Sequence, residues 1–78
     1  MSAAFPAEPA LQLLVARAEL DRVPLTELAL RLRIPRRTLH RLLASSSLRW
    51  DTADRVAVAL GHHPCEIWPS WFEEQQPA

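Results

Sequence analysis

A chain of 78 residues, about half of them apolar, can form one small domain with a single modest core. Nine basic residues balance nine acidic ones, and Cys65 is the only cysteine, which excludes an internal disulfide. The apolar runs are too short to span a membrane, and the N-terminus lacks the basic and apolar regions of a secretory signal. We therefore expect a cytoplasmic protein without a membrane partner.

The predicted elements, taken along the chain, are all helices. One glycine, no tyrosine and many alanines, leucines and arginines favour helix over sheet. We predict an all-α fold of about five short helices. A single domain would cover residues 8–73, between a flexible N-terminal tail at 1–7 and a C-terminal tail at 74–78. Apolar residues at helical spacing place the helices at 9–21, 24–32, 35–44, 50–60 and from 63 to about 72, with a polar loop at 45–49.

Prolines and the only glycine mark the ends of these helices. Pro9, Pro24, Pro35 and Pro64 each stand where a helix can begin without losing an amide hydrogen bond. Gly61 follows the fourth helix at a position where helices commonly end with a left-handed residue.

The positive charge is concentrated in the middle of the chain. Residues 1–30 sum to −2 and residues 50–78 to −4, whereas residues 31–49 sum to +6 and contain no acid. A local basic block governs binding to a polyanion more than the overall net charge does. The middle segment is therefore the candidate binding region.

The helices at 24–32 and 35–44 have the spacing of a helix-turn-helix. Such a motif needs a small residue where the two helices cross, here Ala29, and apolar residues at fixed offsets to hold the crossing. Ile34 would fill the turn. The predicted motif covers residues 24–44, and its core residues are Leu28, Ala29, Leu32, Ile34, Leu39 and Leu42.

This spacing resembles the helix-turn-helix of the Cro/CI-type (XRE) family, the phage-repressor-like DNA-binding domains. The resemblance continues in AVALG at 57–61 and HPCEIW at 63–68, and it covers about residues 9–72. The chain also looks like small Cro-type regulators of actinobacteria and their phages. The resemblance implies a sequence-specific transcription regulator of double-stranded DNA, which inserts helix 35–44 into the major groove and represses by occupying its operator. It also implies a homodimer as the common form.

Two positions depart from the family pattern. The turn residue that is often glycine in the family is Arg33 here, and a left-handed backbone at that position would cost roughly 1 kcal/mol. The polar residue that is common at the start of the first motif helix is Leu25 here. A contact to phosphate or to the second helix is therefore expected to be missing.

One side of helix 35–44 carries the expected DNA-contacting residues, because its leucines, including Leu43, are expected to face the core. Arginine can donate two parallel hydrogen bonds to guanine, so Arg36 and Arg37 are the expected main readers, with Arg41 next. The expected base-contacting residues are Arg36, Arg37, His40 and Arg41. The expected backbone-contacting residues are Thr26, Thr38, Ser45, Ser46, Ser47 and Arg49. Arg31 is expected to be solvated.

His62, His63 and Cys65 invite a metal hypothesis, but ligands so close together at a helix start cannot easily reach a common tetrahedron. No second Cys/His pair follows. We therefore expect no metal, no cofactor and no small-molecule ligand.

The tryptophans have two interpretations. Trp50 is expected to lie in the core. For Trp68, Trp71 and Phe72 two alternatives stay open, namely packing against the first helix or a dimer contact.

Two other functions fit the same fold. One is an antitoxin or adaptor-type protein-interaction module that uses its aromatic C-terminal segment, and the other is an excisionase-like architectural DNA binder. No nucleophile, acid–base pair or glycine-rich phosphate loop is recognisable, so we do not expect an enzyme.

Overall fold

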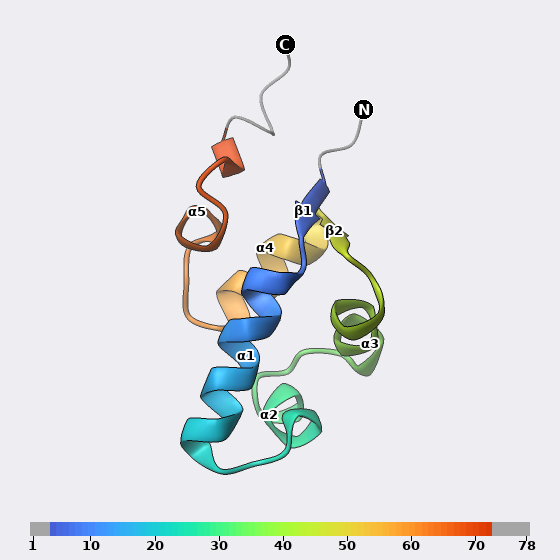
Figure 1. Cartoon of the computed structure of the whole chain (residues 1–78), viewed down its shortest axis with the longest axis vertical. Coiled ribbons are helices and arrows are strands. Elements are labelled where there is room, and N and C mark those ends of the chain that lie inside the picture. Colours follow the sequence, from blue (N-terminus) through green and yellow to red (C-terminus); the bar gives the residue numbers. More distant parts are fainter. Residues whose placement is uncertain (1–3, 73–78) are drawn as a thin grey trace.

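The computed structural model describes residues 4–72, which form five helices and two short strands (Figure 1). In chain order the elements are β1 (Ala4–Pro6), α1 (Glu8–Asp21), α2 (Leu25–Arg31), α3 (Arg36–Ala44), β2 (Ser47–Arg49), α4 (Trp50–Ala59) and α5 (Pro64–Ile67). Helices predominate, as the sequence predicted, but the strands mean that the fold is not all-α. The other parts of the predicted tails, residues 1–3 and 74–78, lie outside the described residues.

Helix α1 is the long element at the middle of the molecule, and it packs against α2 and α3 (Figure 1). It buries Ala10, Leu14 and Ala18 on one side. The helix ends at Arg22, which has a left-handed backbone with φ 57°. Pro24 is extended and precedes α2, in agreement with the predicted boundary. None of the helices in residues 4–72 is long and apolar enough to cross a membrane.

Strands β1 and β2 pair antiparallel and correct two predictions. Phe5 lies opposite Leu48 in the register, and these side chains are only 1% and 2% exposed. Residues 4–6 therefore form a strand instead of a flexible tail, with Phe5 and Ala7 in the core. Residues 47–49 are a strand instead of a polar loop. Each strand has three residues, which is too short for the alternation of a strand to stand out in the sequence.

An aromatic cluster, consisting of Phe5, Trp68 and Trp71, closes the core beside the sheet. The ring centroid of Phe5 lies 5.7 Å from that of Trp68 and 4.7 Å from that of Trp71. The indole Nε1 of Trp68 donates a hydrogen bond to the carbonyl oxygen of Pro6 at 2.8 Å. Both tryptophans are buried within the chain, so neither is available as the alternative dimer contact. Phe72 is exposed.

Two residues that were expected in the core are on the surface. Trp50 is 50% exposed and Leu43 is 57% exposed. A helix turns by about 100° per residue, which places each of them about 70° around its helix from the centre of the buried face. The buried positions of α4 are alanines and valine, and Trp50 is the first residue of the helix, at the edge of that face. Helical spacing alone therefore overstated the width of the buried stripe.

Candidate nucleic-acid interface

Helices α2 and α3 pack against each other across a short turn, and the residues expected to form the motif core lie between them. Leu28, Ala29, Ile34, Leu39 and Leu42 are all buried. Leu32 is partly buried and packs against them. The small side chain of Ala29 lets α3 approach α2 closely, and the two helices are held by side chains from both.

The turn between the two helices is made by Arg33, Ile34 and Pro35. The amide of Arg33 donates to the carbonyl of Leu30 at 3.1 Å, and the amide of Ile34 donates to the carbonyl of Ala29 at 2.8 Å. Arg33 has φ 60°, so the left-handed turn expected for the motif is present with a non-glycine residue in it. This backbone costs roughly 1 kcal/mol relative to glycine.

The outward side of α3 carries a basic face, which we define as Arg36, Arg37, His40 and Arg41. The buried Leu39 and Leu42 mark the inward side of α3. In a view down the helix axis, Arg37 lies about 10° from the opposite, outward direction. His40 and Arg41 lie about 50° to either side, and Arg36 lies about 90° away. All four side chains are exposed. Arg37 is therefore the central residue of this face and Arg36 is at its edge.

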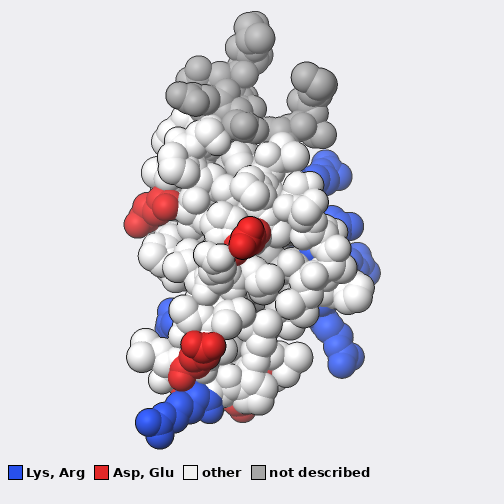
Figure 2. Space-filling model, viewed as in Figure 1, with Lys and Arg blue, Asp and Glu red and all other residues white. Residues whose placement is uncertain are grey.

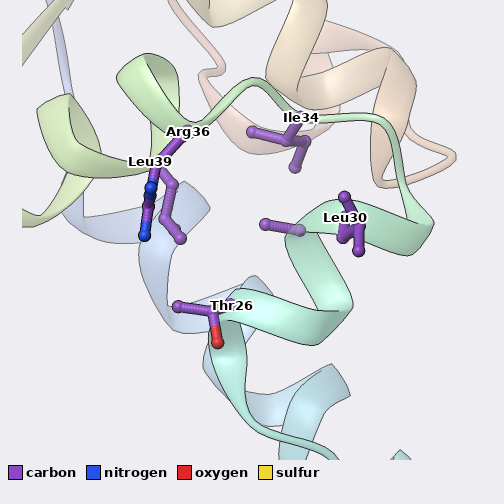
Figure 3. A pocket seen from close by; sticks show the side chains of 6 residues that line it. Thr26, Leu30, Ile34, Arg36 and Leu39 are labelled. Atoms are coloured by element: carbon purple, nitrogen blue, oxygen red, sulfur yellow. The ribbon is translucent and has the colours of Figure 1, made fainter.

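Arg36 borders a groove between α2 and α3. The groove is lined by Thr26, Ala29, Leu30, Ile34, Arg36 and Leu39. In Figure 3 the Arg36 side chain points from the beginning of α3 toward α2, on the side where Thr26 lies. Thus the structure brings together one expected base-contacting residue and one expected backbone-contacting residue.

The basic face carries no ion pair to a carboxylate within residues 4–72. By contrast, Arg31 lies 3.7 Å from Glu27, and Arg49 lies 3.9 Å from Asp51. Figure 2 shows only basic side chains along the side of the molecule where α3 lies, whereas acidic side chains occupy the front and the opposite side together with further basic ones at the lower end. The charge asymmetry seen in the sequence is therefore also an asymmetry in space.

The other expected backbone-contacting residues surround α3. Ser45, Ser46 and Ser47 are exposed and follow its C-terminal end. Arg49 is exposed on β2, on the opposite side of that strand from buried Leu48. Thr38 is half-buried on the edge of α3 away from Arg36.

Sequence reasoning missed one basic residue that lies near this face. Arg55 of α4 lines a hollow together with Arg33 of the turn and Thr38 of α3. The sequence places Arg55 among acidic residues, outside the basic block, and only the packing of α4 beside the turn reveals its position. No local sequence signal could have identified it.

The segment with His62, His63 and Cys65 is a helix cap. The amide of Cys65 donates to Nδ1 of His63 at 3.1 Å, and the amide of His63 donates to Oε1 of Glu66 at 2.7 Å. These hydrogen bonds form a reciprocal cap at the start of α5. The amide hydrogen bond from His63, followed by the contact with His62, lowers the pKa of Glu66. In residues 4–72 no group of histidine, cysteine and acidic side chains is arranged to hold a metal ion.

No family model, no curated protein and no solved structure matches this chain. The resemblance to the Cro/CI-type family is therefore a prediction from the residues quoted for it. The function has to be inferred from the geometry of the basic face and its surroundings.

Proposed function

We propose that this chain is a sequence-specific DNA-binding transcription regulator that inserts α3 into the major groove of duplex DNA. The observation that carries the proposal is the basic face. Its three arginines are exposed, lie on one side of a helix and have no carboxylate partner within the described residues. A solvated surface helix commonly pairs such charges with acids at helical spacing, as Arg31 does with Glu27.

Arginine side chains on this face suit the edges of bases. A guanidinium can donate two parallel hydrogen bonds to O6 and N7 of guanine, which contributes roughly 1–3 kcal/mol of discrimination. Arg37 and Arg41 project from the outer part of α3, and His40 lies beside them. Arg36 reaches toward α2, where a base or a phosphate at the edge of the groove could meet it.

Phosphate contacts would position the domain without reading sequence. Thr26 near the start of α2 lies on one flank of α3. Ser45, Ser46, Ser47 and Arg49 follow its C-terminal end. The acidic side chains elsewhere on the molecule would face away from DNA and limit non-specific affinity. A domain bound in this way would repress by occupying an operator and excluding polymerase.

The proposal is tested by selecting bound duplexes from a random-sequence pool. Enrichment of a defined sequence, and its loss when both Arg37 and Arg41 are changed to alanine, is the expected result. The folded state of the double variant is checked by circular dichroism. Absence of any enrichment with the unchanged protein would refute sequence-specific binding.

A protein-interaction module is the second candidate, and exposed leucines favour it. Leu20 and Leu30 are 80% and 78% exposed, and a partner protein would remove this apolar area from water. The aromatic segment that this function was expected to use is buried at Trp68 and Trp71. Leu20→Gln separates the candidates, because Leu20 lies outside the groove of Thr26 and Arg36 and DNA selection should be unchanged if DNA is the partner.

A further inference from the structure

We infer that Arg33, Thr38 and Arg55 form a seat for a backbone phosphate of duplex DNA, on the flank of α3 opposite Thr26 and Arg36. The inference rests on the proposed function, and it assigns a ligand to a hollow that the basic face does not include. The remaining lining of the hollow is formed by Ile34, Pro35, Val56 and Ala59.

The hollow brings together side chains from three separate segments. Arg33 comes from the turn, Thr38 from α3 and Arg55 from α4. Its volume is about 290 Å³, whereas one water takes about 30 Å³ in the liquid. A phosphate group and several waters therefore fit. The apolar floor lowers the local dielectric, which strengthens the attraction between a guanidinium and an anion above it.

The two arginines supply the donors that a phosphate needs. Neither Arg33 nor Arg55 forms an ion pair within residues 4–72. Two positive side chains on one hollow repel each other, and an anion between them removes this repulsion. Each guanidinium can donate two hydrogen bonds to phosphate oxygens. The hydroxyl of Thr38 can donate a further hydrogen bond.

The backbone of Arg33 is the second observation. Glycine would be more stable than arginine at φ 60°, and Arg33 takes part in the hydrogen bonds of the turn only through its backbone amide. The side chain therefore contributes nothing visible to the turn itself. Because Arg22 has the same left-handed backbone outside the hollow, the strain supports the inference only together with the position of the Arg33 side chain.

The place of the hollow beside α3 fits a phosphate. A helix in the major groove, which is about 12 Å wide, has a sugar–phosphate strand on either side. Thr38 lies on the edge of α3 away from Arg36, about 110° around the helix from the centre of the basic face. The groove at α2 would then meet one strand, and the hollow at α4 would meet the other.

The test compares Arg33→Gly and Arg55→Gln with matched controls, using short labelled duplexes of two unrelated sequences over a series of salt concentrations. Each variant should bind both duplexes more weakly by the same factor. Loss of a whole phosphate contact reduces the slope of log affinity against log salt by about 0.9, and each single variant should give part of this change because the other arginine still contacts the phosphate. Arg33→Gly should also raise the melting temperature.

The chain offers a matched control for each variant. Arg22 has φ 57° at the end of α1 and lies outside the hollow, so Arg22→Gly relieves the same kind of strain. Arg17 is an exposed helical arginine near Asp21, so Arg17→Gln removes one charge as Arg55→Gln does. Both controls should bind duplex with nearly the affinity of the unchanged protein.

The outcomes separate the phosphate seat from the proposed function. If Arg33→Gly and Arg55→Gln bind normally while Arg37→Ala loses its sequence preference, the seat is refuted and the proposed function stands. If the controls weaken binding as much as the two variants do, net charge alone explains the effect and the seat is refuted. If the unchanged protein binds no duplex even at low salt, both proposals fall.

Discussion

The indole nitrogen of Trp68 donates a hydrogen bond to the carbonyl of Pro6, 2.8 Å away and 62 residues earlier in the chain. This bond joins the segment after α5 to strand β1, and the ring of Trp68 also contacts Phe5. The first prediction is that Trp68→Phe lowers the free energy of unfolding by at least about 1 kcal/mol, because the hydrogen bond is lost and the smaller ring fills less of the buried space. Urea unfolding followed by circular dichroism measures this. An unchanged midpoint would show that the hydrogen bond does not contribute to stability.

Phe5→Ala should destabilise the domain far more, by about 3–5 kcal/mol, since it removes a buried ring and leaves a cavity. Pro6→Ala, at an exposed position of the same strand, is the matched control and should have a small effect. The comparison of the two unfolding midpoints checks the prediction. Equal, small losses for both variants would mean that β1 is not part of the core in solution.

The residues of the basic face should contribute unequally to the discrimination between DNA sequences. Arg37→Ala should reduce the discrimination between the selected duplex and a one-base variant by roughly 1–3 kcal/mol, because Arg37 is the outermost residue of α3. Arg36→Ala should reduce it less, because Arg36 lies at the edge beside α2. Competition binding with the two duplexes gives the ratio. A larger loss of discrimination for Arg36→Ala than for Arg37→Ala would contradict an orientation of α3 in which Arg37 lies deepest in the major groove.

Glu66 gives the stability of the domain an acid-sensitive component. Its pKa in the folded state is lowered from the ordinary value of 4.5, so the ionised carboxylate stabilises the folded state. This stabilisation is complete above the unfolded pKa and is lost as pH falls through the lower, folded pKa. The melting temperature of the unchanged protein should therefore exceed that of Glu66→Gln at neutral pH, and the two should converge in acid. A constant difference down to low pH would rule out this role.

Gly61→Ala should lower the free energy of unfolding by about 1 kcal/mol, as expected for a non-glycine residue in a left-handed conformation. Gly61 has φ 81°, and a methyl group there would meet no atom within 4 Å. The cost is therefore a backbone cost and not a clash. Thermal unfolding measures it, with Ala59→Gly as a control for loss of helix propensity. A neutral Gly61→Ala would indicate that the loop after α4 adopts another conformation.

Local patterns predicted the two helices α2 and α3 and the turn between them, because each of these features depends on residues that are close together in the sequence. The small Ala29, the apolar Ile34 and the boundary at Pro35 all follow from rules of spacing and backbone geometry. The sheet could not be predicted in this way. Phe5 and Leu48 are each a single apolar residue in a short segment, and only their pairing across the chain makes them core residues.

The same limit applies to the candidate site. The arginines of α3 lie on one helix, so their common direction follows from about 100° per residue. Arg33 and Arg55 come from different segments, and their shared hollow depends on how α4 packs beside the turn. Residue type and spacing contain no information about that packing.

The pairing of β1 with β2 and the aromatic cluster have a consequence for synthesis of the chain. Phe5 is synthesised well before Leu48 and Trp71, the residues that it contacts. The helix-turn-helix, by contrast, is complete once α3 has been made. The local contacts between α2 and α3 can therefore form before the long-range contacts of Phe5, and we expect the pairing of β1 with β2 to form late in folding.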